Sequence, residues 1–356
     1  MPYGQVNADV IGTSVAGSNL GAGNASLMKS RIINGAMVID QRNAGASVTP
    51  TAGVYTLDRW YCASSVSSKY SVQQNAGSVT PPVGFTKYLG FTSLSAYSSG
   101  STDNFNTTQT IEGFNVADLG WGTANAKTVT LSFQVYSSLT GTFSGSLSNG
   151  SVNRSYPFTF TISSASTWTT ISVTVAGDTT GTWSTDNSAG LNVTFNLGCG
   201  STLLGTAGAW AGANYKGATS SVSVVGTSGA TFYITGVQLE VGSSATGFEY
   251  RQYGQELALC QRYFYQASKY LGLPITSDTL YGPCITFPVT MRATPTLNSG
   301  SVFIPRTGSA GTVAISTGVT GIIASPDGVD LYNSANNWTV NNAAQISVTA
   351  GFSAEL

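Results

Sequence analysis

Histidine is missing from this sequence of 356 residues, and its absence limits the chemistry that the protein can perform. A Ser-His-Asp or Cys-His catalytic arrangement cannot be assembled, and a histidine general base is excluded as well. Only carboxylates, lysine, tyrosine or cysteine could move protons. We therefore expect that the protein is not an enzyme and that it uses no cofactor.

Cysteine is scarce, with four residues and no C-x-x-C pair. Without histidine, a zinc site would need scattered thiolates and carboxylates. We therefore expect no metal site, and we expect the cysteines to pack as small buried thiols. They are Cys62, Cys199, Cys260 and Cys284.

Charge is also scarce, since charged residues make up 8% of the chain against roughly 25% in an average globular protein. The 14 basic residues nearly balance the 15 acidic ones and form no basic block, which argues against a nucleic-acid partner. No apolar run reaches the ~18 residues that would indicate a membrane span. The N-terminal stretch MPYGQVNADV lacks the basic start and apolar core of a secretory signal, so we expect assembly in a cytoplasm.

The remaining composition favours β-structure. Aromatic residues make up 11% of the chain, and Ser, Thr, Asn and Gly replace the missing charged residues. Disordered chains are poor in aromatic and β-branched residues, so the low charge here does not indicate disorder. Hydroxyl-rich strands joined by tight turns fit this composition.

Two stretches show the alternation that is typical of strands with one buried face. TVTLSFQVY and TTISVTVAG each place apolar side chains at every second position. The residues expected on the buried faces are Val129, Leu131, Phe133 and Val135 in the first, and Ile171, Val173 and Val175 in the second. The spacing predicts an all-β protein with a jelly-roll-like antiparallel sandwich.

Composition divides the chain into four parts. Residues 1–30 are small and polar and predict an extended arm that becomes ordered against a partner. We expect the sandwich over residues 31–250, a connecting helix over 251–270, and a second, smaller β-sandwich over 271–356. Turn signals such as Pro326 to Gly328 punctuate the last part.

The connecting segment has apolar residues at helical spacing, namely Leu257, Cys260, Phe264 and Ala267. A helix over Tyr253 to Ser268 is too short to be stable alone. We therefore expect Leu257 and Phe264 to lie at a subunit or domain junction.

Several aromatic residues lie among Gly, Ser and Asn, where turns are expected. An exposed flat ring beside amide groups is a common way to hold a sugar, because the ring stacks on the C–H face while polar groups bind the hydroxyls. The alternative is that these rings plug the ends of the sandwich. The candidate ligand-binding residues are Trp121, Trp183, Trp210 and Tyr215.

Acidic residues leave a hydrolase reading open, because glycosidases use two carboxylates at a set separation. The sequence gives no pairing signal, and most acids lie near turns where Asp caps backbone N–H groups. The residues concerned are Asp103, Glu112, Asp118, Asp178 and Asp186.

Two longer motifs carry a family resemblance. GNASLMKSRIINGAMVIDQRNAGASVTPTAGVYTLDRW and TFYITGVQLEVGSSATGFEYRQYGQELALCQRYFYQ resemble the boundary sequences of phage virion proteins of the tail-fibre type. The region between them is similar to carbohydrate-binding-module jelly rolls. The resemblance covers about residues 20 to 295. It implies an oligomeric virion protein, which we expect to be a homotrimer attached to other virion proteins through the N-terminal arm.

One departure from the carbohydrate-binding pattern concerns the last strand of the sandwich. Ile234 to Gln238 lacks the acidic pair that often ends this strand, so the calcium site of those modules is not carried over.

The leading expectation for the function is a tail fibre or receptor-binding protein that contacts a host surface glycan. A head decoration or cement protein or a head fibre on the capsid is the alternative, and a polysaccharide depolymerase is the third reading.

Overall fold

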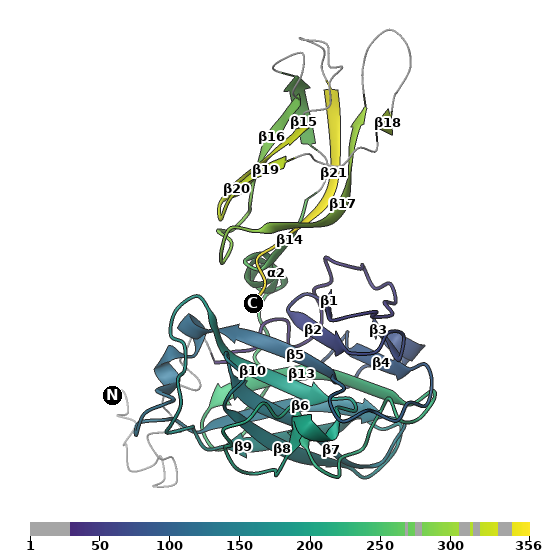
Figure 1. The fold of residues 1–356 in the computed structure, drawn as a ribbon, viewed down its shortest axis with the longest axis vertical. Helices are drawn as coiled ribbons and strands as arrows, with labels where there is room; N and C mark the ends of the chain where they lie inside the picture. Colours follow the sequence, from purple (N-terminus) through teal and green to yellow (C-terminus); the bar gives the residue numbers. More distant parts are fainter. Residues whose placement is uncertain (1–28, 268–269, 275–279, 306–313, 316–320, 334–343) are drawn as a thin grey trace, which may run out of the picture. The chain divides into compact units, whose positions relative to one another are not determined.

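The computed structural model describes residues 29–267, 270–274, 280–305, 314–315, 321–333 and 344–356 (Figure 1). The expected arm over residues 1–30 lies outside the described residues, apart from Lys29 and Ser30. The chain forms two compact units. The first comprises the described residues of Met1–Val38, Ser47–Val54 and Trp60–Tyr250, and the second comprises those of Ile39–Ala46, Tyr55–Arg59 and Arg251–Leu356.

The chain passes between the two units several times before the longest segment of the second unit begins at Arg251. Ile39–Ala46 and Tyr55–Arg59 cluster with the second unit although they precede most of the first in sequence. Contacts between residues far apart in sequence assign these two segments to the second unit. The sequence pattern does not predict this assignment.

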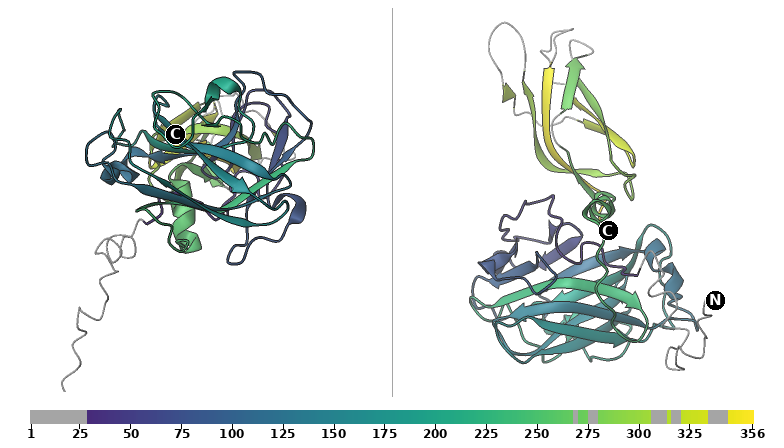
Figure 2. Two further views of the ribbon diagram at one scale, coloured as in Figure 1. Left: turned by 90° about the horizontal axis from the view of Figure 1, so that it is seen from below. Right: turned by 180° about the vertical axis from the view of Figure 1, so that it is seen from behind.

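The first unit is an antiparallel sandwich of two sheets, which lie face to face (Figure 2). Within this unit, one sheet has the order β2 (Trp60–Ser64), β5 (Phe105–Glu112), β10 (Ala189–Asn196), β7 (Gly141–Asn149) and β8 (Ser155–Ile162). Three of the four residues of strand β1 (Val54–Leu57) belong to the second unit. The other sheet has the order β3 (Tyr70–Gln74), β4 (Leu89–Ser93), β13 (Thr231–Val241), β6 (Val129–Ser137) and β9 (Thr169–Val175). These findings confirm the predicted all-β class.

Short elements complete the first unit. The strands β11 (Leu204–Gly205) and β12 (Gly217–Ala218) pair in parallel. Single 3-10 turns lie at η2 (Ala76–Ser78), η3 (Gly113–Asn115), η4 (Ala117–Leu119) and η5 (Ser201–Leu203).

The predicted alternation of buried and exposed side chains is confirmed in β6 and β9. All four expected residues of β6 are buried. On β9, burial alternates along the strand and Val175 is fully buried. The other inward residues of β9 are only half-buried because this strand forms an edge of its sheet.

Phenylalanines fill the space between the two sheets. Phe133 of β6 lies edge-on to Phe160 of β8 and to Phe195 of β10, with ring centroids 5.1 and 4.9 Å apart. All three rings are at most 5% exposed. Buried rings of this size supply much of the hydrophobic stabilisation of a sandwich core.

Within the described residues, the second unit contains a β-sheet in which seven strands follow one hydrogen-bonded path and an eighth strand pairs beside that path. The order is β18 (Ala314–Ile315), β17 (Thr296–Pro305), β21 (Ala344–Ser353), β15 (Tyr270–Pro274), β16 (Leu280–Thr286), β20 (Gly328–Asn333) and β19 (Gly321–Ser325), while β14 (Phe264–Gln266) pairs with β21. The last strand of the chain therefore lies between earlier ones.

The predicted helix was wrong in its length. Helix α2 covers Tyr253–Gln261, and Phe264 lies on β14, where it pairs with Ser353 of β21. The aromatic stretch that follows α2 suits a strand as well as a helix, and β21 supplies the partner. Within the described residues, no helix is long and apolar enough to cross a membrane.

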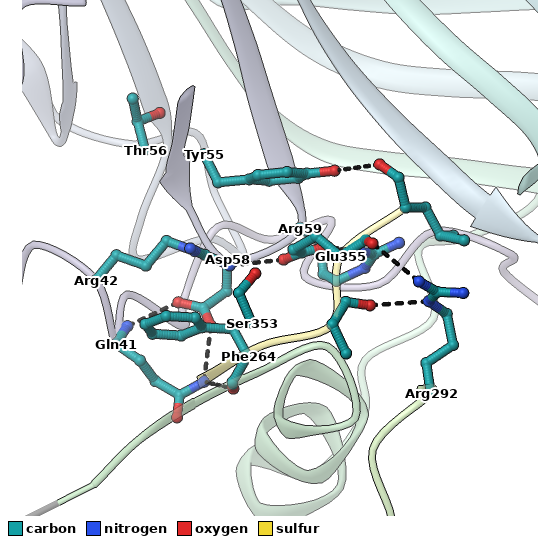
Figure 3. A network of polar contacts seen from close by, with 12 residues as sticks. Gln41, Arg42, Tyr55, Thr56, Asp58, Arg59, Phe264, Arg292, Ser353 and Glu355 are labelled. Carbon is teal, nitrogen blue, oxygen red and sulfur yellow. Dashed lines mark hydrogen bonds and ion pairs between the residues drawn. The ribbon is translucent and has the colours of Figure 1, made fainter. Parts of the chain in front are cut away.

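A buried polar network holds the segment after β21 within the second unit (Figure 3). The guanidinium groups of Arg42 and Arg59 both pair with the carboxylate of Glu355. Arg292 donates hydrogen bonds to the carbonyl oxygens of Ala354 and Glu355, over 2.8 and 3.0 Å. The residues near positions 42 and 59 are thereby tied to the end of the chain.

Candidate functional site

Three of the four predicted ligand-binding residues meet in one ring cluster. Trp121 follows η4, Trp183 lies between β9 and β10, and Trp210 lies between β11 and β12. Their ring centroids are 4.7, 5.3 and 5.4 Å apart for the 121–183, 121–210 and 183–210 pairs. Every pair packs edge to face, an arrangement that aromatic quadrupoles favour.

Each indole N–H of the cluster donates to a backbone carbonyl. Trp121 donates to Lys127 over 2.7 Å, and Trp210 donates to Ala176 over 2.8 Å. Trp183 donates to Thr180 over 3.2 Å. These bonds fix the orientation of all three rings.

The three rings differ in exposure. Trp121 is 7% exposed and forms the inner part of the cluster. Trp183 and Trp210 are only half-buried and reach the surface. The cluster thus closes part of the sandwich and also presents two fixed rings to solvent.

Tyr156 extends the cluster, and sequence reasoning missed it. Its ring centroid lies 5.4 Å from that of Trp210, and the two ring planes are inclined at 60°. Burial raises the pKa of the Tyr156 hydroxyl. The available signal was the period-two spacing of Tyr156, Phe158 and Phe160, which places all three on one face of β8.

An ion pair lies beside the rings, and it too was missed. Arg154 donates from Nε and Nη2 to the two carboxylate oxygens of Asp178, over 2.7 and 2.8 Å. Thr180 also donates to Asp178, through its N–H at 3.1 Å and its hydroxyl at 3.0 Å. No sequence pattern connects Arg154 with Asp178, because the chain only brings them together in the folded sandwich.

This bonding sets the charge state of the pair. Burial would raise the pKa of Asp178, but hydrogen bonds from Arg154 and Thr180 outweigh it and hold that pKa below its usual value. The hydrogen bond to Asp178 raises the pKa of Arg154. Both groups are therefore ionised at neutral pH, and their charges cancel.

Backbone bonds lock the loops that carry these side chains. Gly122 donates its N–H to the carbonyl of Asp178 over 2.7 Å, which joins the Trp121 turn to the loop after β9. Ser155 and Ala211 exchange two backbone hydrogen bonds of 3.0 and 2.8 Å, which joins the Trp210 loop to the start of β8.

Gly181 has φ of +79°, and a Cβ there would lie 2.7 Å from Cγ of Arg154. Glycine thus lets the arginine stem pass close to the backbone.

Tyr215 lies elsewhere. Its ring packs so closely on Gly205 that a Cβ at that glycine would be 2.3 Å from Cδ2 of Tyr215. Its backbone N–H donates to the hydroxyl of Ser155 over 3.1 Å. Tyr215 therefore packs in the β11–β12 region, and the structure does not bring it into the tryptophan cluster.

A second aromatic group covers the outer face of the sheet that contains β6 and β13. Tyr136 and Tyr233 are cross-strand partners with parallel rings 5.2 Å apart, and Tyr88 stacks on Tyr233 at 5.1 Å. Trp168 contacts Tyr88 and Tyr136 and donates its indole N–H to Thr80 over 2.9 Å. The sequence signal was Tyr136, which alternates with the inward Val135 and so points away from the core.

Most of the acidic residues that could have served a glycosidase have structural partners. Asp118 pairs with Arg31, and Asp103 accepts hydrogen bonds from Tyr97 and Gly100. Asp186 accepts from Ser188, Asp178 pairs with Arg154, and Glu112 is 1% exposed. The described part of the chain holds no group of three or more acids, cysteines or histidines that could bind a metal ion.

The predicted burial of the thiols is confirmed for Cys62, Cys199 and Cys260, which are free and buried. The side chain of Cys284 lies outside the described residues. Burial raises the pKa of Cys199 to about 11, so this thiol stays protonated at neutral pH.

Comparison with known proteins gives only distant structural likenesses. No family model and no curated protein sequence matches the chain. A putative sugar binding protein from Bacteroides thetaiotaomicron is 12% identical, with a TM-score of 0.34, and the match covers 60% of this chain and all of that one (100%). A family 11 carbohydrate-binding module from Clostridium thermocellum is 13% identical, with a TM-score of 0.28. That match covers 56% of this chain and 100% of that chain.

The enzymatically active domain of tailspike protein 4 from bacteriophage CBA120 is 11% identical, with a TM-score of 0.30. That match covers 60% of this chain but only 21% of the tailspike chain. These scores are low, so a functional assignment depends on the residues of the site itself.

Proposed function

We propose that this protein is a structural component of a bacteriophage particle, of the tail-fibre or receptor-binding type, and that its first sandwich binds host surface glycan. The observation that carries the proposal is the meeting of Trp121, Trp183 and Trp210 at one place. They come from three separate loops, and two of their rings reach the surface.

The site combines the two kinds of group that sugar recognition needs. The fixed rings of Trp183 and Trp210 offer apolar surface for the C–H face of a pyranose. Arg154 lies close to these rings and provides hydrogen-bond donors for hydroxyl groups, and the hydroxyl oxygen of Thr180, whose own hydrogen is donated to Asp178, can accept. Since the loops are locked by backbone bonds, little ordering entropy is lost when a ligand binds.

The virion location is supported by the two boundary motifs, around residues 23–60 and 231–266, which resemble those of phage virion proteins. On this proposal the polar arm over residues 1–30 attaches the protein to other virion proteins. A homotrimer is the proposed assembly. Immunogold labelling of intact particles tests the location, and label confined to the head would instead support a decoration role.

Glycan binding is tested with immobilised oligomers of glucose, galactose and mannose, and of the corresponding uronic acids. The intact protein should bind at least one of these saccharides. Trp210→Ala should weaken that binding at least about fivefold, because the ring supplies stacking area.

Trp168→Ala is the matched control. Trp168 is also half-buried and donates its indole N–H to a backbone carbonyl, but it lies in the other aromatic group. The Trp168→Ala variant should leave the affinity for the saccharide unchanged. Absence of binding to every saccharide, or an equal loss with both variants, would refute the proposed site.

A further inference from the structure

One nitrogen of Arg154 has no hydrogen-bond partner within the described residues. Nε and Nη2 are both taken up by Asp178. The third nitrogen, Nη1, faces Gly212, since a Cβ built there would have Nη1 at 4.0 Å as its nearest heavy atom. Gly212 lies two residues after Trp210, whose loop is pinned to the start of β8.

Contacts of neighbouring glycines place the Arg154 side chain beside the rings. A Cβ at Gly181 would lie 2.7 Å from Cγ of Arg154. A Cβ at Gly122 would lie 2.8 Å from the carbonyl oxygen of Gly181 and 3.1 Å from Cδ1 of Trp183, so the arginine stem and the Trp183 ring flank the same stretch of backbone. The Arg154 side chain is about one-fifth exposed, at 21%, so the free nitrogen is accessible beside the half-buried rings.

We propose that Arg154 determines the ligand class of this site, and that the site takes a neutral saccharide whose hydroxyl groups accept hydrogen bonds from Nη1. The inference rests on the proposed glycan-binding function. It assigns Arg154 a role as a directional donor rather than as a free positive charge.

The choice of a neutral ligand follows from the ion pair. Asp178 is almost fully buried, its side chain being 3% exposed, and it bonds to two of the three guanidinium nitrogens. A carboxylate on the ligand would therefore meet a cation that is already neutralised, and Asp178 would repel it. A hydroxyl needs no net charge, only a well-oriented N–H.

The rigid geometry favours this role. The stem of Arg154 lies against Gly181, and the fork is held by two parallel hydrogen bonds. A bidentate pair of this kind fixes the plane of the guanidinium, so the direction of the Nη1 donors is fixed before the ligand arrives.

The test compares affinities for neutral oligomers of glucose, galactose and mannose with those for the matching uronic acid oligomers. The intact protein should prefer a neutral oligomer, and its affinity should change little between low and high salt. Arg154→Lys should reduce the neutral affinity about tenfold, because a lysine cannot keep the bidentate bond and donate from a second nitrogen at once.

Asp178→Asn should shift the preference of the site towards the acidic oligomers. It leaves Arg154 unneutralised, so the affinity for the uronic acid oligomer should rise relative to the neutral one, and salt should weaken that gain. Circular dichroism of each variant checks that the sandwich is folded. If Asp178→Asn fails to fold, Arg154→Lys decides alone.

The outcomes separate the two claims. If no oligomer binds to the intact protein, the proposed function fails. If binding is lost in Trp210→Ala but Arg154→Lys leaves it unchanged, or if the intact protein prefers the uronic acid oligomers, the glycan site stands and the role of Arg154 is overturned.

Discussion

The ring of Trp121 meets the ring of Trp183 edge to face, with 4.7 Å between the two centroids. Trp121 is 7% exposed, whereas Trp183 is half-buried at the surface. One ring therefore supports the other. This pairing separates residues that stabilise the site from residues available to a ligand.

Replacement of the inner ring should cost stability. Trp121→Ala removes a buried aromatic side chain that packs against two other rings, and we expect the free energy of unfolding to fall by about 3 kcal/mol. Urea denaturation of the full chain measures this loss. Thr123→Ala controls for loss of the hydrogen bonds of the same turn, since Thr123 is exposed and its hydroxyl donates to Gly120 and accepts from Asn125. A loss below about 1 kcal/mol for Trp121→Ala would show that the cluster is not packed as described.

The buried carboxyl of Asp58 should make the stability of the second unit depend on pH. Burial raises its pKa from 3.8 to about 6, against the lowering effects of Arg42 and of hydrogen bonds from Gln41. Because the folded state holds the proton more tightly than the unfolded state, this contribution is fully present below about pH 3.8 and is lost as the pH rises through about 6. Charging this group costs about 3 kcal/mol.

Asp58→Asn removes this titration. The stability of the variant should vary less than that of the intact protein between pH 4 and about 6.5. At neutral pH it should be more stable by about 1–2 kcal/mol, less than the full cost, because an N–H of Gln41 loses an acceptor. Parallel stability curves for both proteins, measured by denaturation at several pH values, would contradict the assignment.

The two residues predicted at a junction should now behave differently. Phe264 is 3% exposed on β14, and the guanidinium of Arg42 lies 3.8 Å from its ring centroid. Phe264→Asp should therefore unfold the second unit, seen as rapid cleavage by protease. Leu257 is only half-buried on α2. Leu257→Asp should leave that unit folded and, if it lies at a subunit junction as we propose, reduce the mass measured by light scattering.

Purified protein should not cleave bacterial polysaccharide. Asp103, Asp118, Asp178 and Asp186 each hold a hydrogen bond or an ion pair that stabilises a turn or a loop. Release of reducing ends measures cleavage. A release that disappears in a single variant such as Asp186→Asn would show that one of these acids is catalytic.

Local pattern was enough to predict much of the first unit. The alternation in TVTLSFQVY predicted which side chains of β6 face the core, because a strand turns successive side chains to opposite faces. The turn-rich contexts of Trp183 and Trp210 placed both residues in loops, where the structure has them. The connecting helix was predicted at its start but not at its end, because the pairing of Phe264 with Ser353 depends on a strand far away in sequence.

The fold class, the faces of the regular strands and the lack of histidine chemistry can be read from the amino-acid sequence, because they follow from composition and from the geometry of single strands. Folding in three dimensions is what brings three separate tryptophans into one cluster, pairs Arg154 with Asp178, and assigns residues near positions 42 and 59 to the second unit. These relationships join positions far apart in the chain. Their contacts depend on how the sheets pack and how the loops close, which no local pattern encodes.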